Sequence, residues 1–167
     1  MKSVINASLF NVAWLICVIF GDIAAVAVSA AILLLHFFFI SRNLSEFPLL
    51  IKVFILGWFV DTALFSSGIL TAESEKIFPP LWLSCLWLMF ATTLNHCFMW
   101  FQEHKILAIL VGFISGPTSY FAGCQLSDIA LAEPQLRSLL IIALLWAVIF
   151  PVVLSWASRL NAQPSMK

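Results

Sequence analysis

The chain has 167 residues, of which 63% are hydrophobic and 10% charged, with eight basic and eight acidic side chains. A soluble domain averages about 45–50% apolar and about 25% charged residues, so this composition excludes a soluble globular protein. The zero net charge and the lack of a basic cluster exclude a nucleic-acid-binding protein. We therefore predict a single integral membrane domain over residues 1–167, surrounded by membrane lipids and without a cofactor.

Six apolar segments are long enough to cross a bilayer as helices, since a hydrocarbon core of about 30 Å needs about 20 helical residues. The predicted spans are about 4–20, 22–40, 48–70, 79–101, 105–126 and 136–160. The tight connections at Gly21-Asp22 and at 102–105 predict two antiparallel helix pairs. The sequence thus predicts an all-α, polytopic bundle of six transmembrane helices. It does not predict the oligomeric state.

The basic residues are unevenly divided between the two ends of these spans. Lys76 and Arg137 fall on one side, and the remaining six fall on the other: Lys2, Arg42, Lys52, Lys105, Arg159 and Lys167. Lysine and arginine are enriched in cytoplasmic loops, so we expect both termini in the cytoplasm (N-in/C-in). The expected location is the inner, cytoplasmic membrane, with several passes.

Asp61 is the first candidate for a functional residue, because it lies in the middle of the apolar segment 48–70. A carboxylate at that depth is costly and must be protonated, paired or facing water. Ionisable residues within membrane spans mark a functional site by default. We therefore interpret Asp61 as a proton-linked or cation-pairing group.

Counting about 1.5 Å per helical residue from the cytoplasmic end assigns the other polar residues to levels. His36, Asn95 and His96 are expected at about 6–8 Å, Asn11 and Ser115 at about 10–15 Å, and Asp61, Ser119 and Tyr120 near 20 Å. These residues come from several spans. The depth count predicts a polar cavity that opens on the cytoplasmic side.

Gly116-Pro117 predicts a helix break within the span 105–126. Proline removes one helical hydrogen bond, and the freed carbonyl must face protein or water in a bilayer. Transporters use interrupted helices of this kind to line a substrate path. A kink that only serves packing is the favoured interpretation of the two, and the spacing of Gly112 and Gly116 is also typical of close helix packing.

No metal site is predicted. His36, His96 and Cys97 would have to converge, but Cys97 points about 100° away from His96 on one helix. Without CxxC spacing, the cysteines read as small core residues. A disulfide among Cys17, Cys85 and Cys124 remains the lesser alternative.

Three functions remain open. The favoured one is binding or transport of a small or amphipathic molecule through the polar cavity. The second is an intramembrane enzyme acting on a lipid or isoprenoid, with His96 as general base. The third is a membrane scaffold whose polar groups bond one another between helices.

Several short motifs together resemble a known family. They are Asn11-Val12-Ala13-Trp14, Gly57-Trp58-Phe59-Val60-Asp61, Pro80-Leu81-Trp82-Leu83, Thr93-Leu94-Asn95-His96 and Gly116-Pro117-Thr118-Ser119-Tyr120. The chain resembles, over nearly its whole length, an uncharacterised family of small bacterial inner-membrane proteins known only as a domain of unknown function. The resemblance implies a single inner-membrane domain. It implies no activity.

Overall fold

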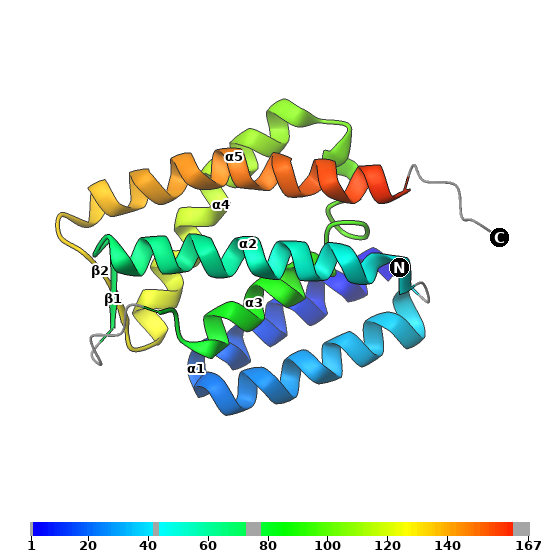
Figure 1. Ribbon diagram of the computed structural model, residues 1–167, viewed down its shortest axis with the longest axis horizontal. Helices are drawn as coiled ribbons and strands as arrows, with labels where there is room; N and C mark the ends of the chain where they lie inside the picture. The colour runs from blue at the N-terminus through cyan, green and yellow to red at the C-terminus, as the bar shows by residue number, and fades with distance from the viewer. Residues whose placement is uncertain (1, 42–43, 73–77, 162–167) are drawn as a thin grey trace.

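The structure, a computed structural model, describes residues 2–41, 44–72 and 78–161. These residues form an all-α bundle with one small sheet (Figure 1). The α-helices are α1 (Lys2–Leu35), α2 (Phe47–Ser66), α3 (Leu81–Ala91), α4 (Lys105–Leu126) and α5 (Gln135–Asn161). The shorter elements are the helical turns η1 (His36–Ile40), η2 (Leu44–Glu46) and η3 (Met99–Gln102) and the strands β1 (Leu70–Ala72) and β2 (Ile129–Leu131).

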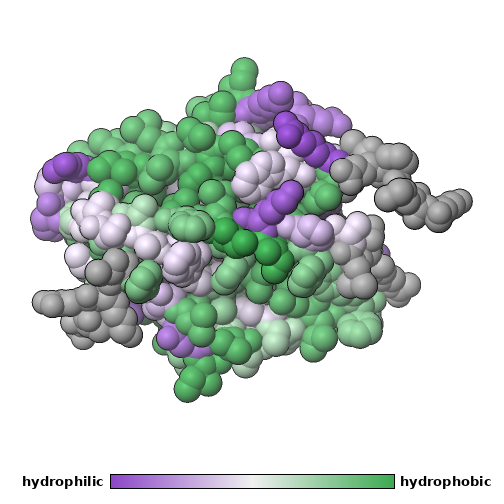
Figure 2. Space-filling view, viewed as in Figure 1, coloured by the Kyte–Doolittle hydropathy of each residue, from purple (hydrophilic) through white to green (hydrophobic). Residues whose placement is uncertain are grey.

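Large apolar side chains cover much of the outer surface, as Figure 2 shows for one face. Ile23, Ile106 and Phe20 are 89%, 76% and 69% exposed, and many other aliphatic and aromatic residues are exposed as well. A soluble monomer does not expose apolar surface on this scale. The chain is therefore a transmembrane protein, with lipid in contact with these side chains.

In the described residues, four helices are long and apolar enough to cross a membrane. They are Lys2–Ile40, Phe47–Ser66, Lys105–Leu126 and Gln135–Leu160. The last three agree closely with the predicted spans. The predicted count of six is not reproduced, because segments 4–20 and 22–40 form one bent helical element and segment 79–101 is not one continuous helix.

Gly21 bends α1 into two arms. Its φ of 70° and ψ of −156° lie in a region that glycine adopts and other residues avoid. The second arm returns beside the first, toward the N-terminus (Figure 1). As a result, the Lys2 ammonium donates a hydrogen bond to the Ile40 carbonyl over 3.3 Å. The predicted tight turn between the first two spans is thus a bend within one element.

Asp22, next to this bend, holds the start of α3. Its carboxylate accepts a hydrogen bond from the Trp82 backbone N–H over 2.9 Å. The first N–H groups of a helix have no partner within the helix, and the positive end of the helix dipole favours a carboxylate there. A side chain from the α1 bend therefore caps a helix 60 residues further along the chain.

Helix α3 is too short to cross a bilayer by itself. Its 11 residues extend about 16 Å at 1.5 Å per residue. After Ala91, the hydroxyl groups of Thr92 and Thr93 donate back to the carbonyls of Met89 and Phe90. Such local bonds compete with a regular helix, and the chain continues in turns as far as η3. This is the physical reason why segment 79–101 is not one helix.

Glycines allow the helices to approach closely. A methyl group on Gly57 of α2 would lie 2.0 Å from the Trp87 ring of α3. On α4, Gly112 and Gly116 face Trp146 of α5, with hypothetical Cβ contacts of 2.3 and 2.2 Å. The predicted close-packing role of the Gly112–Gly116 pair is therefore what the structure shows.

The two ends of the bundle differ. Strands β1 and β2 pair antiparallel at one end, whereas α1 begins and α5 ends at the other (Figure 1). The predicted orientation requires the chain ends to share a side, and the described parts of α1 and α5 meet this requirement. The orientation itself stays a prediction, and three residues on which it depends, Arg42, Lys76 and Lys167, lie outside the described residues.

Candidate functional site

Asp61 is fully buried between three helices, at 0% exposure. Trp87 of α3 donates its indole N–H to one carboxylate oxygen over 2.7 Å, and the Tyr120 hydroxyl of α4 donates to the other. Asp61 and Tyr120 thus lie together, as the depth count predicts. Both oxygens have a neutral donor, so the carboxyl group is paired rather than exposed to water.

Trp87 and Tyr120, which both donate to Asp61, also line a cavity of about 70 Å³. Seven aromatic side chains line it together with smaller residues: Phe10, Trp14, Trp82, Trp87, Phe90, Tyr120 and Trp146. Leu70 of β1 and Ile129 of β2 also line it, which places it toward the strand end of the bundle. Ser119 also lines it and is exposed. We call this space the aromatic cavity.

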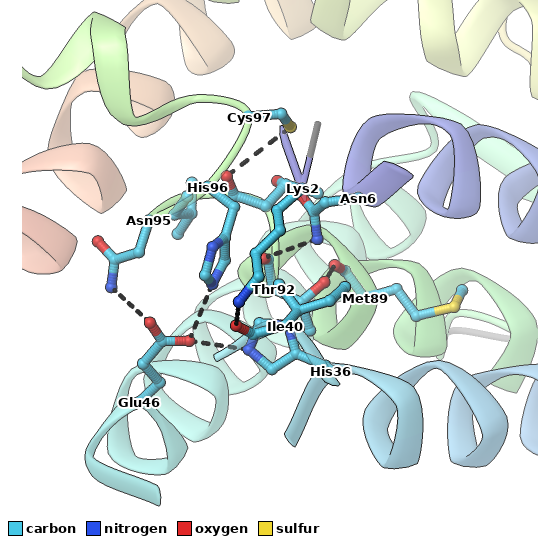
Figure 3. A network of polar contacts seen from close by, with 12 residues as sticks. Lys2, Asn6, His36, Ile40, Glu46, Met89, Thr92, Asn95, His96 and Cys97 are labelled. Carbon is cyan, nitrogen blue, oxygen red and sulfur yellow. Dashed lines mark hydrogen bonds and ion pairs between the residues drawn. The ribbon is translucent and has the colours of Figure 1, made fainter. Parts of the chain in front are cut away.

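A second polar group lies at the opposite end of the bundle, where α1 begins and α5 ends. His36 of η1, Glu46 of η2 and His96, which follows α3, bring their ring nitrogens and carboxylate together (Figure 3). The distances to Glu46 Oε2 are 2.8 Å from His36 Nε2 and 3.5 Å from His96 Nε2. The Asn95 amide donates to Glu46 Oε1 over 3.5 Å, and Gln102 donates to Asn95 Oδ1 over 3.0 Å. We call His36, Glu46 and His96 the His–Glu cluster.

Glu46 precedes the first residue of the α2 span and is ionised in this environment. Burial would raise the pKa of its carboxyl group, but hydrogen bonds and charge attraction from His36 and His96 outweigh burial and lower that pKa from 4.5 to about 2. His36 Nδ1 is buried without a hydrogen-bond partner among the described groups, and the contact of His96 Nε2 with Glu46 is long, at 3.5 Å. The cluster therefore brings a negative charge and two imidazole rings into a small volume.

The remaining predicted residues lie apart from both places. Asn11 is exposed, and its amide bonds to the Ala7 carbonyl of its own helix over 2.8 Å. Ser115 is exposed on α4. The expected interruption at Gly116 and Pro117 does not occur, because α4 continues through Pro117. The predicted polar ladder is thus divided into the Asp61 group and the His–Glu cluster, about 22 Å apart along α2.

Three of the side chains that complete these groups are not predicted from the sequence. Glu46 and Gln102 lie in predicted connections, where a polar residue usually faces solvent. The signal that could have found them is their position at the same membrane end as His36 and His96. Trp87 lies within the predicted span 79–101, where hydropathy does not distinguish it, although a buried indole N–H generally needs a partner. The four cysteines are free thiols, and Cys97 lies outside the His–Glu cluster.

Comparisons with known proteins define the family but no activity. Searches of curated proteins and of solved structures find no match. The model of a family described as "Protein of unknown function (DUF2878)" matches residues 3–152, which is nearly the whole chain. The chain therefore belongs to the DUF2878 family.

Proposed function

We propose that this membrane protein binds a small or amphipathic molecule in the aromatic cavity. The observation that supports the proposal is open space bounded by aromatic side chains, next to a buried carboxyl group. Ligand sites in proteins are concave and mostly apolar, with few well-placed polar groups. The cavity volume is about 70 Å³, and a single water molecule requires about 10–15 Å³. The cavity therefore has room for a short chain or a small ring. Transport of the same molecule is the wider form of the proposal.

The polar groups at the cavity favour a ligand with a hydrogen-bonding end. Trp146 lines the cavity, and its indole nitrogen is buried without a hydrogen-bond partner among the described groups. An unpaired buried donor costs about 1–3 kcal/mol, which an acceptor atom on a ligand would recover. Ser119 and Tyr120 also line the cavity, and the Tyr120 hydroxyl donates to Asp61. An alcohol or carbonyl compound with an apolar body fits this arrangement.

We place the protein in an inner membrane with both termini in the cytoplasm. Under this proposal each of the two arms of α1 crosses the membrane, and α3 crosses it together with segment 92–102. With α2, α4 and α5, the chain then crosses six times. The uneven distribution of lysine and arginine supports the orientation. The aromatic cavity then lies in the outer half of the bilayer and the His–Glu cluster near the cytoplasmic surface.

The test is photolabelling of the purified protein in lipid nanodiscs with a diazirine-bearing fatty alcohol. Crosslinked residues are mapped by mass spectrometry in the wild type and in Gly123→Phe. A side chain added at Gly123, which lines the cavity, meets no atom within 4 Å at its Cβ, so phenylalanine can fill the space. We expect labelling of α1 and α4 residues at the cavity in the wild type and its loss in Gly123→Phe.

The matched control is Ile114→Phe, which adds a similar bulk on the lipid-facing side of α4, where Ile114 is 64% exposed. This variant should retain the labelling of the cavity. Equal labelling of the cavity residues in wild type and Gly123→Phe, with both proteins folded, contradicts the proposal. Labelling restricted to lipid-facing residues contradicts it as well.

An enzyme acting on a lipid or isoprenoid is the second candidate, and one observation favours it. His36, Glu46 and His96 converge at the end that we assign to the cytoplasmic headgroup level, where imidazole can act as a general base. If the protein is such an enzyme, lipid incubated with the wild type should be chemically altered, whereas lipid incubated with Glu46→Gln should not. Binding in the aromatic cavity predicts no such difference.

A further inference from the structure

The His–Glu cluster combines three side chains that favour metal ions. Two imidazoles and one carboxylate approach one another from η1, η2 and the turn after α3, segments separated by up to 60 residues (Figure 3). The offered ligand atoms all lie within 4.8 Å of one another. The sequence predicts no metal site, because Cys97 is directed away from His96, whereas in the structure Glu46 lies beside both histidines.

The distances suit a single ion. Ligand atoms bound to one zinc ion at about 2.0–2.1 Å stand about 3.4 Å apart in a tetrahedral site. His96 Nε2 and His36 Nε2 lie 3.5 and 2.8 Å from the same oxygen of Glu46. One ion could bind all three atoms after side-chain rotations from these positions, since the atoms lie within 4.8 Å of one another. It would give His96 Nε2, which is buried and 3.5 Å from Glu46, a stronger partner.

The surroundings resemble those of a metal site rather than of a surface ion pair. The second oxygen of Glu46 accepts a hydrogen bond from the Asn95 amide, and Gln102 in turn donates to Asn95. Hydrogen bonds of this kind to ligating carboxylates orient them. Glu46 and His96 retain 12% and 17% exposure of their side chains, so an ion can enter from that end.

We propose that His36, Glu46 and His96 bind a divalent transition-metal ion of the zinc or ferrous class. Two imidazoles with one carboxylate form a donor set that both ions accept, and it leaves at least one coordination position for water or another ligand. Magnesium and calcium, which prefer oxygen ligands, fit the site poorly. The inference does not depend on the aromatic cavity.

The experiment uses the full-length chain, purified in detergent with a tag free of histidine and cysteine and stripped with a chelator. Zn²⁺ binding is measured by calorimetry, and Co²⁺ replaces it for visible absorption spectroscopy. We expect one ion per chain and the absorption band of Co²⁺ with nitrogen and oxygen ligands. Glu46→Gln and His96→Gln should weaken binding by at least about 10-fold, since even loss of a group behind a ligand costs about 10–100-fold.

The chain provides matched controls in Glu103 and His104. Both residues lie outside the His–Glu cluster. Glu103 is exposed, and the His104 ring stacks on Trp100 and forms a hydrogen bond with the Trp100 backbone carbonyl. Glu103→Gln and His104→Gln should bind Zn²⁺ like the wild type. Equal weakening by all four substitutions, or by none, overturns the proposal.

The wild type also decides the question without any variant. Bound Zn²⁺ should raise its midpoint of thermal unfolding, because a ligand that binds only the folded state stabilises it. A folded wild type that takes up no Zn²⁺ and shows no shift overturns the proposal and leaves a metal-free hydrogen-bond network. His96→Cys, which retains a metal ligand, should preserve binding.

Discussion

Trp87 of α3 reaches Asp61 of α2 because α2 has no side chain at position 57. Gly57 and Asp61 are four residues apart and share one face of the helix. The Trp87 ring lies where a Gly57 side chain would be, and its indole N–H donates to Asp61 over 2.7 Å. The short motif Gly57–Asp61 therefore encodes both a close helix contact and the polar bond that follows it.

Replacing Asp61 tests how much its hydrogen bonds contribute to the stability of the fold. Asp61→Leu leaves the Trp87 N–H and the Tyr120 hydroxyl buried without an acceptor, at about 1–3 kcal/mol for each group. Asp61→Asn retains an acceptor oxygen for Trp87 and offers an N–H to the Tyr120 oxygen, so its loss should be smaller. Thermal unfolding in detergent, followed by circular dichroism, measures both. A Leu variant as stable as the wild type would show that the pairing contributes nothing.

Gly57→Ala should destabilise the bundle through a steric conflict. Its Cβ would lie 2.0 Å from the Trp87 ring, so Trp87 must move and weaken its bond to Asp61. Forced insertions into packed interiors cost about 1–3 kcal/mol. Gly123→Ala is the control, because its Cβ meets no atom within 4 Å. The same unfolding measurement should separate the two variants, and equal midpoints contradict the expectation.

Gly21→Ala tests the bend in α1 by a different mechanism. No atom lies within 4 Å of an added Cβ at Gly21, so the substitution has no steric conflict with other segments. The backbone conformation at φ 70° and ψ −156° is instead unfavourable for alanine, at about 1–3 kcal/mol. We expect a lower unfolding midpoint and faster proteolysis near residue 21. Unchanged values for both would mean that α1 does not need this bend.

The helices α2, α4 and α5 were predictable because apolar length alone specifies a helix that crosses a bilayer. The contact between Asp61 and Tyr120 was predictable too, since residues at equal depth on adjacent helices can meet. The end of α3 was not, because Thr92 and Thr93 lie in an apolar stretch that continues the hydropathy signal. Local hydrogen bonds from their hydroxyl groups decide the outcome there.

The His–Glu cluster was only half predictable. The depth count assigns His36 and His96 to one level, and their rings lie 5.1 Å apart between centroids. Glu46 was missed because it lies in a connection between spans, for which depth counting gives no position. Where such a connection folds depends on contacts between segments distant in sequence, and these are not encoded in local hydropathy.

The lowered pKa of Glu46 predicts how acid affects the metal-free protein. A carboxyl group with a pKa of about 2 when folded and about 4.5 when unfolded stabilises the fold above pH 4.5. That contribution is lost as the pH falls from 4.5 through 2. In the presence of a chelator, the advantage of wild type over Glu46→Gln in unfolding free energy should therefore shrink as the pH falls below 4.5. Glu103→Gln, which removes an exposed carboxylate, is the control, and its difference from the wild type in unfolding free energy should not change comparably between pH 6 and pH 3. The prediction is contradicted if the advantage of wild type over Glu46→Gln grows in acid.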